Sequence, residues 1–288
     1  MSRYIFANWF SLLIKYFLIK YFLIGLGFDI KLRAKINNCI IEIDVETYEL
    51  LISMYSIGLI YAIECIEGKL RVNDSWHYDY AINCWVKEGV KFKRLHGVIF
   101  EVFDYGEYSA LDVTDKIIVD VGAGYGETAL YFLKRGARRV IAVEPCPEVY
   151  REMLENLRLN GVEDKVAPLN AALSSAHGSA CIECPSGKVT VGTITLGDII
   201  DRFGLHGGVL KMDCEGCEYD VILNDYEHVR LFDVVYFEYH AYITKIPVQV
   251  LLEKLSEDFK CEIVSNKEFY RRHGFSEKLL GLVRCVKK

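Results

Sequence analysis

The stretch from residue 117 to residue 133, IIVDVGAGYGETALYFL, constrains the fold of this chain more than any other. Its first five residues are apolar apart from Asp120, which predicts a strand buried on both faces. Gly122, Gly124 and Gly126 follow at once, and apolar residues then return at helical spacing. Glycine permits a sharp turn and a close approach of a ligand, because no Cβ atom stands in the way. The stretch therefore predicts a strand, a tight turn and a helix whose first N–H groups point into a crevice.

The next strand gives this turn a more specific meaning. Residues 139–143 form a second apolar run, and Glu144 follows it. An acidic residue about 20 positions after the glycines is placed to accept hydrogen bonds from both hydroxyls of a ribose. A dehydrogenase loop would have the spacing Gly-x-Gly-x-x-Gly, and this loop has Gly-x-Gly-x-Gly instead.

Six motifs together resemble the class I S-adenosylmethionine-dependent methyltransferases, and more narrowly the FkbM family of O-methyltransferases. They occur in that family's order and spacing between residues 105 and 288. The motifs are DVGAGYG (120–126), VEPCP (143–147), ENLRLN (155–160), NAAL (170–173), TLGDI (195–199) and LKMDCEGCE (210–218).

The resemblance implies an α/β fold of the class I methyltransferase type, a Rossmann-like doubly wound sheet with a terminal antiparallel strand pair. The alternation of apolar runs and helical patterns after residue 113 agrees with a parallel sheet. Residues 261–265 and 280–286 are expected to form the terminal pair. We therefore expect the chain to have three segments. They are an apolar helix at 1–28, a variable α+β extension at 29–112 and the S-adenosylmethionine-binding domain at 113–288.

Within the extension, the sequence predicts a strand at 35–43, a helix at 45–63 and a further strand at 98–104. Within the domain, residues 174–193 predict a β-hairpin. Thr195 is expected to cap a helix that runs to residue 203.

The resemblance also implies the cofactor site. Glu144 is the ribose ligand, and Asp120 holds the methionine end of the cofactor, directly or through water. Asn170 and Ala171 close the third strand and are placed for the adenine edge, although Asn170 is equally a turn-capping amide. The complete set of expected cofactor-binding residues is Asp120, Gly122, Ala123, Gly124, Tyr125, Glu144, Pro145, Asn170, Ala171 and Asp213.

The chemistry is expected at the ends of the fourth and fifth strands. Methyl transfer to a hydroxyl is helped by a base that takes the proton as the new bond forms. Asp213, Glu215 and His240 are the catalytic candidates, and histidine suits the role best because it titrates near neutral pH. His240 is equally a structural histidine at a strand end. An alternative is that Asp213, Glu238 and His240 bind a divalent metal, for which an oxygen-rich set suits Mg²⁺.

The acidic motif after the fourth strand indicates an oxygen acceptor, because Asn-Pro-Pro-Tyr and Asp-Pro-Pro-Tyr, the signatures of amino methylation, are missing. We expect a methyl acceptor that is a hydroxyl of a sugar, a glycolipid or another small metabolite. The net charge of −6 disfavours binding to a nucleic-acid backbone. The alternatives are an RNA methyltransferase and a non-catalytic, membrane-associated Rossmann-like scaffold.

The chain has ten cysteines. Ordinary buried thiols in a cytoplasmic protein are the expectation, since no cleavable signal pattern is clear. Two alternatives stay open. Cysteine pairs could form disulfides, or the Cys-x-x-Cys pairs at 181–184 and 214–217 could hold a structural zinc.

Residues 4–28 are the most apolar stretch, and they contain the repeat KYFLI. Two central lysines oppose a membrane span, at roughly 2.5–3.5 kcal/mol each. The alternatives are a helix on a membrane surface, a helix packed on the protein or in a homodimer, and, less favoured by the lysines, a true membrane span.

Overall fold

The computed structural model describes residues 16, 31–36, 39–73, 75–264, 276 and 278–288. The N-terminal helix expected at 4–28 lies outside these residues. Among the residues described, no helix is both long enough and apolar enough to cross a membrane. The chain divides into two compact units, one ending at Phe100 and one beginning at Glu101.

The described residues of the first unit form two antiparallel sheets, the helix α3 and the start of a second helix, α4 (Gly97–Phe103). Two strands form a hairpin, and five short strands form a meander in sequence order. The elements are β1 (Lys31–Ile36), β2 (Cys39–Asp44), α3 (Val45–Ser56), β3 (Ile63–Ile66), β4 (Lys69–Val72), β5 (Trp76–Asp79), β6 (Cys84–Lys87) and β7 (Val90–Phe92).

Two strand predictions for this region are wrong, and the helix expected at 45–63 is α3, which begins at Val45 as predicted but ends at Ser56. The single strand expected at 35–43 is the hairpin of β1 and β2, in which Ile36 pairs with Cys39. Two asparagines at 37–38 interrupt the apolar run, and asparagine favours turns. The strand expected at 98–104 is the helix α4 (Gly97–Phe103). A short apolar run fits a buried helix as well as a strand, so periodicity cannot decide between them.

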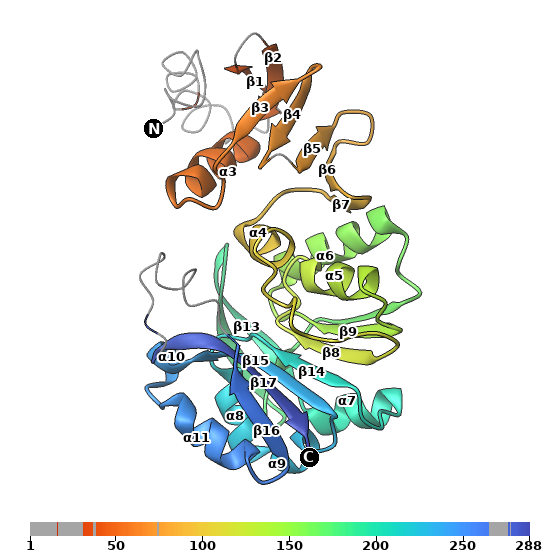
Figure 1. The fold of residues 1–288 in the computed structure, drawn as a ribbon, viewed down its shortest axis with the longest axis vertical. Coiled ribbons are helices and arrows are strands. Elements are labelled where there is room, and N and C mark those ends of the chain that lie inside the picture. The colour runs from red at the N-terminus through yellow and green to blue at the C-terminus, as the bar shows by residue number, and fades with distance from the viewer. Residues whose placement is uncertain (1–15, 17–30, 37–38, 74, 265–275, 277) are drawn as a thin grey trace. The chain divides into compact units, whose positions relative to one another are not determined.

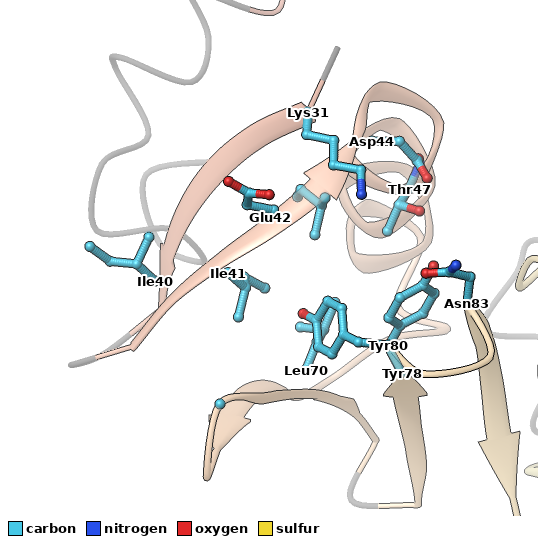
Figure 2. A pocket seen from close by; sticks show the side chains of 12 residues that line it. Lys31, Ile40, Ile41, Glu42, Asp44, Thr47, Leu70, Tyr78, Tyr80 and Asn83 are labelled. Carbon is cyan, nitrogen blue, oxygen red and sulfur yellow. The ribbon is translucent and has the colours of Figure 1, made fainter. Parts of the chain in front are cut away.

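A cavity of about 320 Å³ lies between the β1–β2 hairpin and the meander. Figure 2 shows the rings of Tyr78 and Tyr80 on one side and Lys31 and Glu42 on the other. The two tyrosine rings pack edge to face, with their centroids 5.0 Å apart. Asp44 also lines this cavity, and its carboxylate caps α3 by accepting a hydrogen bond from the N–H of Thr47 at 2.6 Å.

The second unit is built on a seven-stranded sheet in the order β10-β9-β8-β14-β15-β17-β16. All neighbours from β10 to β15 are parallel, and β17 is antiparallel to both β15 and β16. The strands are β8 (Ile117–Val121), β9 (Arg139–Val143), β10 (Val166–Leu169), β14 (Val209–Met212), β15 (Val234–His240), β16 (Phe259–Ile263) and β17 (Leu280–Lys287).

Helices cover both faces of this sheet (Figure 1). On one side lie α5 (Glu127–Lys134) and α6 (Pro147–Asn160). On the other, apolar side chains of four helices pack on the sheet in one buried cluster. These helices are α7 (Leu196–Phe203), α8 (Cys217–Asn224), α9 (Tyr226–Val229) and α11 (Val248–Leu255).

A small second sheet is inserted after β10. It has the order β11-β13-β12, and its antiparallel pair is the expected hairpin. Its strands are β11 (Ala172–Leu173), β12 (Ser179–Cys184) and β13 (Gly187–Ile194). Thr195 then caps α7 as expected, in a capping box with Asp198. The order of the large sheet and its antiparallel last strand confirm the expected Rossmann-like methyltransferase fold.

Candidate functional site

The site lies where the strand order of the large sheet reverses. From β8 the chain proceeds to β9 and β10 on one side, and it later returns to β14 and β15 on the other. Ligands of open α/β sheets bind at the carboxyl ends of the strands at such a switch point. Gly122, Glu144 and Asp213 directly follow β8, β9 and β14, so the sheet brings these three residues to one edge.

A cavity of about 640 Å³ occupies this edge. Its walls come from the ends of β8 and β9, from strand β12 of the inserted hairpin, and from the turn between β14 and α8. The lining residues are Val121, Gly122, Val143, Glu144, Pro145, Cys146, Ala172, Leu173, Ala180, Cys181, Ile182, Glu183, Asp213, Cys214, Glu215, Cys217 and Ile243.

Gly122 is required by the closeness of β8 and β14. A Cβ atom on this residue would lie 1.7 Å from the carbonyl oxygen of Asp213, and its φ of +71° is in the left-handed region. The N–H groups of Gly122 and Ala123 both donate to the carbonyl oxygen of Val143, at 3.0 and 3.1 Å. These bonds fix the glycine turn against the end of β9.

Glu144 is buried, and its carboxylate already organises the backbone around it. One oxygen accepts a hydrogen bond from the N–H of Gly124 at 3.0 Å, and the other accepts one from the N–H of Cys146 at 2.9 Å. Burial raises the pKa of Glu144 to about 7, although these two N–H groups oppose the rise. Each carboxylate oxygen can accept a further hydrogen bond, and Glu144 lines the cavity, which suits hydroxyl donors.

Asp120 is fully buried and is not part of the cavity wall. It accepts a hydrogen bond from the hydroxyl of Thr128 at 2.5 Å and pairs with the ammonium of Lys211 at 3.0 Å. Lys211 also donates to the carbonyl oxygen of Gly122 at 2.8 Å. Burial opposes the charge of Lys211, but Asp120 and Asp213 outweigh it and raise the pKa of the lysine. The buried pair of Asp120 and Lys211 thus fixes the glycine turn through the hydrogen bond from Lys211 to Gly122.

The other expected cofactor residues lie in different places. Pro145 lines the cavity, whereas Asn170 and Ala171 are not among its lining residues. The amide of Asn170 donates to the carbonyl oxygens of Glu144 and Pro145, at 2.8 and 3.0 Å, so it acts as a turn cap. Tyr125 packs against Cys146 and Cys184, beside the site.

The cysteines differ from the expectation of ordinary thiols. Eight of them form four disulfides: Cys39–Cys65, Cys146–Cys184, Cys214–Cys217 and Cys261–Cys285. Cys181 is free and exposed, so the zinc arrangement of the two Cys-x-x-Cys pairs is not formed. The bridge from Cys146 to Cys184 ties the loop after β9 to the inserted hairpin. The cavity therefore has covalently joined walls on that side.

The catalytic candidates do converge, around the ring of His240. This ring is buried, and its Nδ1 lies 2.9 Å from a carboxylate oxygen of Glu218. Its Nε2 lies 3.3 Å from Glu238, 3.5 Å from Glu215 and 3.8 Å from Asp213. Of these, Asp213 and Glu215 also line the cavity.

The surroundings of His240 determine its charge. Burial alone would lower the pKa of the ring, but hydrogen bonds to Glu218 and Glu238 and the nearby carboxylates raise it to about 11. In this arrangement the ring is an imidazolium at neutral pH and has no lone pair with which to take a proton. The carboxylates of Asp213 and Glu215 fit the role of base better than the histidine does.

Four residues at this edge were missed as site residues. Glu218 and Lys211 lie within the motif LKMDCEGCE, but their buried contacts could not be read from it. Tyr108, whose hydroxyl donates to Asp213 at 3.3 Å, and Glu107 precede the first core strand. Burial and the charge of Glu238 raise the pKa of Glu107 well above its usual value.

The sheet order and the site at its switch point define a class I Rossmann-like methyltransferase domain. Residues 120–260 match the family model described as the methyltransferase FkbM domain. Residues 120–260 are thus an FkbM methyltransferase domain, as their motifs indicate.

Individual known proteins are similar over shorter stretches. A ribosomal protein L11 methyltransferase of Alteromonas mediterranea is 45% identical over 56 residues, which is 19% of each chain. The chain thus spans about a fifth of the length of this curated relative.

Two solved structures are also similar. An FkbM methyltransferase of Methylobacillus flagellatus has 17% identity and a TM-score of 0.46, and the match covers 62% of this chain and 45% of that one. Aeropyrum pernix fibrillarin, solved with bound S-adenosyl-L-methionine, has 16% identity and a TM-score of 0.37, with coverages of 61% and 69%.

Proposed function

We propose that this protein is an S-adenosylmethionine-dependent O-methyltransferase that acts on a hydroxyl of a sugar, a glycolipid or another small metabolite. One observation carries the proposal. A single cavity is lined both by Glu144 and Gly122, which suit a nucleoside, and by the carboxylates of Asp213 and Glu215. The FkbM family model that residues 120–260 match supports the same cofactor.

The residues of the cavity fit the cofactor in size and chemistry. When bound, S-adenosylmethionine supplies a methyl group on a positively charged sulfur. Glu144 would accept hydrogen bonds from the ribose hydroxyls, and Pro145, Ala172 and Leu173 offer an apolar surface for the adenine ring. The absence of a side chain at Gly122 lets the ligand approach the backbone.

The acceptor end of the cavity is acidic. In the transfer, the acceptor oxygen would bond to the methyl carbon while the bond from that carbon to sulfur breaks and S-adenosylhomocysteine leaves. The carboxylate of Asp213 or Glu215 would take the hydroxyl proton. The same carboxylates accept hydrogen bonds from neighbouring hydroxyls, which favours a polyhydroxylated acceptor. They would repel a phosphate backbone, and this disfavours the alternative of an RNA methyltransferase.

The first experiment is a calorimetric titration of the purified protein with S-adenosylhomocysteine. We expect micromolar binding, at least tenfold weaker binding by Glu144→Gln, and unchanged binding by Glu163→Gln, which replaces an exposed glutamate. Folded protein that binds no S-adenosylhomocysteine would contradict the proposal and favour a non-catalytic scaffold.

The second experiment tests the acceptor class. Monosaccharides, glycolipids and small alcohols are incubated with the protein and S-adenosylmethionine, next to unmodified RNA, and release of S-adenosylhomocysteine is measured. Turnover with a hydroxyl compound is the expected result. Turnover with RNA alone would replace the proposed acceptor by the RNA alternative.

A further inference from the structure

The arrangement around His240 has the form of a metal-binding site as well as that of an ion pair. Its Nε2 faces three carboxylates that come from the turn after β14 and from strand β15. One oxygen of Asp213, one of Glu238 and a nitrogen of His240 lie within 4.8 Å of one another. Donor atoms bound to one small divalent cation lie at similar mutual distances, because each is about 2.0–2.2 Å from the ion.

The second ring nitrogen, Nδ1, has a carboxylate partner, as the nitrogen not bound to the metal usually has in a histidine ligand. Nδ1 lies 2.9 Å from Oε1 of Glu218, and that oxygen also accepts the N–H of His240 at 3.0 Å. The second oxygen of Glu218 accepts the N–H of Gly216 at 3.0 Å, and the side chain is fully buried. A histidine ligand typically donates its outer N–H to a carboxylate, which orients the ring and presents Nε2 to the metal.

The charge at this place also favours a cation. Four carboxylates, those of Asp213, Glu215, Glu218 and Glu238, surround one imidazole ring. The nearby ammonium of Lys211 is paired with Asp120 at 3.0 Å. Like charges at this spacing repel strongly when they are partly removed from water.

We propose that Nε2 of His240 and the carboxylates of Asp213 and Glu238 bind one divalent transition-metal ion, which displaces the proton from Nε2, with Glu215 at its open side. The imidazole disfavours Mg²⁺ and Ca²⁺, which prefer oxygen ligands alone, and the three carboxylates favour Mn²⁺, Fe²⁺ or Zn²⁺. Glu215 is the exposed member, with 68% of its side chain accessible. Three firm ligands would leave positions for water or an acceptor oxygen.

Within the part of the chain that the structure describes, two other groups of possible ligands are weaker. Cys214 and Cys217 lie near Glu218, but their sulfurs form a disulfide. Asp225, Glu227 and His228 form another group, in which His228 and Asp225 pair within one helical turn. That second group provides a matched control.

The role of the metal rests on the proposed function, whereas its binding does not. Asp213 and Glu215 line the cavity in which we place the cofactor and the acceptor. A divalent cation between them would lower the pKa of an acceptor hydroxyl and orient its oxygen. The metal would thus assist the same proton removal for which the carboxylates are otherwise the base.

The test uses the full-length chain, freed of metal by a chelator and titrated with Mn²⁺ at pH 7.5. Free Mn²⁺ is followed by electron paramagnetic resonance, and Zn²⁺ is titrated in parallel by calorimetry. We expect one ion per chain. We expect at least tenfold weaker binding by His240→Gln and Glu238→Gln, a smaller loss by Glu215→Gln, and no change by His228→Gln.

Because His240 is buried, His240→Gln must first be shown to fold by circular dichroism. Glu215→Gln replaces an exposed side chain and tests the site even if the buried variants unfold. The proposal is overturned if the folded wild-type chain binds neither Mn²⁺ nor Zn²⁺, or if His228→Gln rather than Glu215→Gln weakens binding.

S-adenosylhomocysteine titrations distinguish this failure from failure of the proposed function. Chain that binds S-adenosylhomocysteine but no metal overturns the metal site alone. Chain that binds metal but no S-adenosylhomocysteine supports the metal site and contradicts the methyltransferase proposal.

Discussion

At the scale of single residues, Gly122 shows how closely two strands meet beneath the cavity. A Cβ atom there would overlap the carbonyl oxygen of Asp213, and the left-handed backbone disfavours a side chain in any case. We expect Gly122→Ala to lower the free energy of unfolding by about 1–3 kcal/mol and to weaken S-adenosylhomocysteine binding at least tenfold. Urea denaturation and calorimetry measure the two effects.

Gly192 provides the control for this substitution. A Cβ atom at Gly192 meets no heavy atom within 4 Å, and its backbone is not left-handed. Gly192→Ala should therefore change the free energy of unfolding by less than about 1 kcal/mol. Equal effects of the two substitutions would show that the contact with Asp213 is not what requires glycine at position 122.

Glu144 should make cofactor binding depend on pH. Its pKa of about 7 lies above the usual range because of burial, so its ionisation opposes folding as the pH rises from about 4.5 to about 7. Ribose hydroxyls need the ionised form as an acceptor. We expect affinity for S-adenosylhomocysteine to rise about tenfold between pH 6 and pH 8.

Other charged groups near Glu144 must be separated from this effect. Lys211 and Asp120 act on it through charge, and Glu183 lines the same cavity. Calorimetry from pH 6 to pH 8 should show the slope in wild type and in Glu183→Gln, and should show none in Glu144→Gln. A slope that persists in Glu144→Gln would assign the titration to another group.

Residue types and spacing were enough to place Glu144, Gly122, Asp213 and Glu215 at one cavity. They could not show the protonation of His240, because it depends on several carboxylates around the ring, one of which, Glu218, is 22 positions away in the chain. They also could not decide between the two roles of Asn170. Both depend on which partners folding brings near a side chain, and a motif does not contain that information.

At the scale of elements, the bridge between Cys146 and Cys184 joins the start of α6 to the end of β12. A disulfide that closes a loop of this length contributes about 2–4 kcal/mol by restricting the unfolded chain. We expect Cys146→Ala/Cys184→Ala to lose that much stability in urea under oxidising conditions. It should also bind S-adenosylhomocysteine more weakly, because β12 is a cavity wall.

The remaining disulfides require a control. Wild type and the double variant are compared with and without a reducing agent. If the bridge stabilises the hairpin, reduction should remove most of the difference between them. A difference of the same size after reduction would mean that the lost side chains, and not the bridge, are responsible.

The elements were predicted best where the pattern is long and repeated. The strand expected at 117–121 is β8 (Ile117–Val121) without change, and the hairpin and the capped helix α7 are as predicted. The predictions failed at 35–43 and 98–104, where short apolar runs are not followed by a motif such as the glycine turn after β8. Over so few residues, strand and helix periodicities do not differ enough, and α4 was taken for a strand.

At the scale of the whole molecule, the boundary between the two compact units lies within α4. All residues that line the larger cavity belong to the second unit. We expect a chain that begins at Gly97, and so retains all of α4, to fold and to bind S-adenosylhomocysteine within about threefold of full-length affinity, about 0.7 kcal/mol. Circular dichroism and calorimetry measure this.

The result also separates the roles of the units. Retained binding with loss of turnover would assign acceptor recognition to the first unit. If the shortened chain does not fold, the second unit depends on the first for stability, and the division between them is only geometric.

The position of β17 has a consequence for how the protein is made. This strand is the last of the seven in the sequence, yet it lies between β15 and β16 and pairs with both. On the ribosome, β15 and β16 are therefore synthesised before the strand that joins them exists. Until Leu280–Lys287 emerges, an apolar edge of β15 stays open to other nascent chains. The growing chain needs protection from aggregation at that stage, and its sheet is completed only when synthesis has passed this strand.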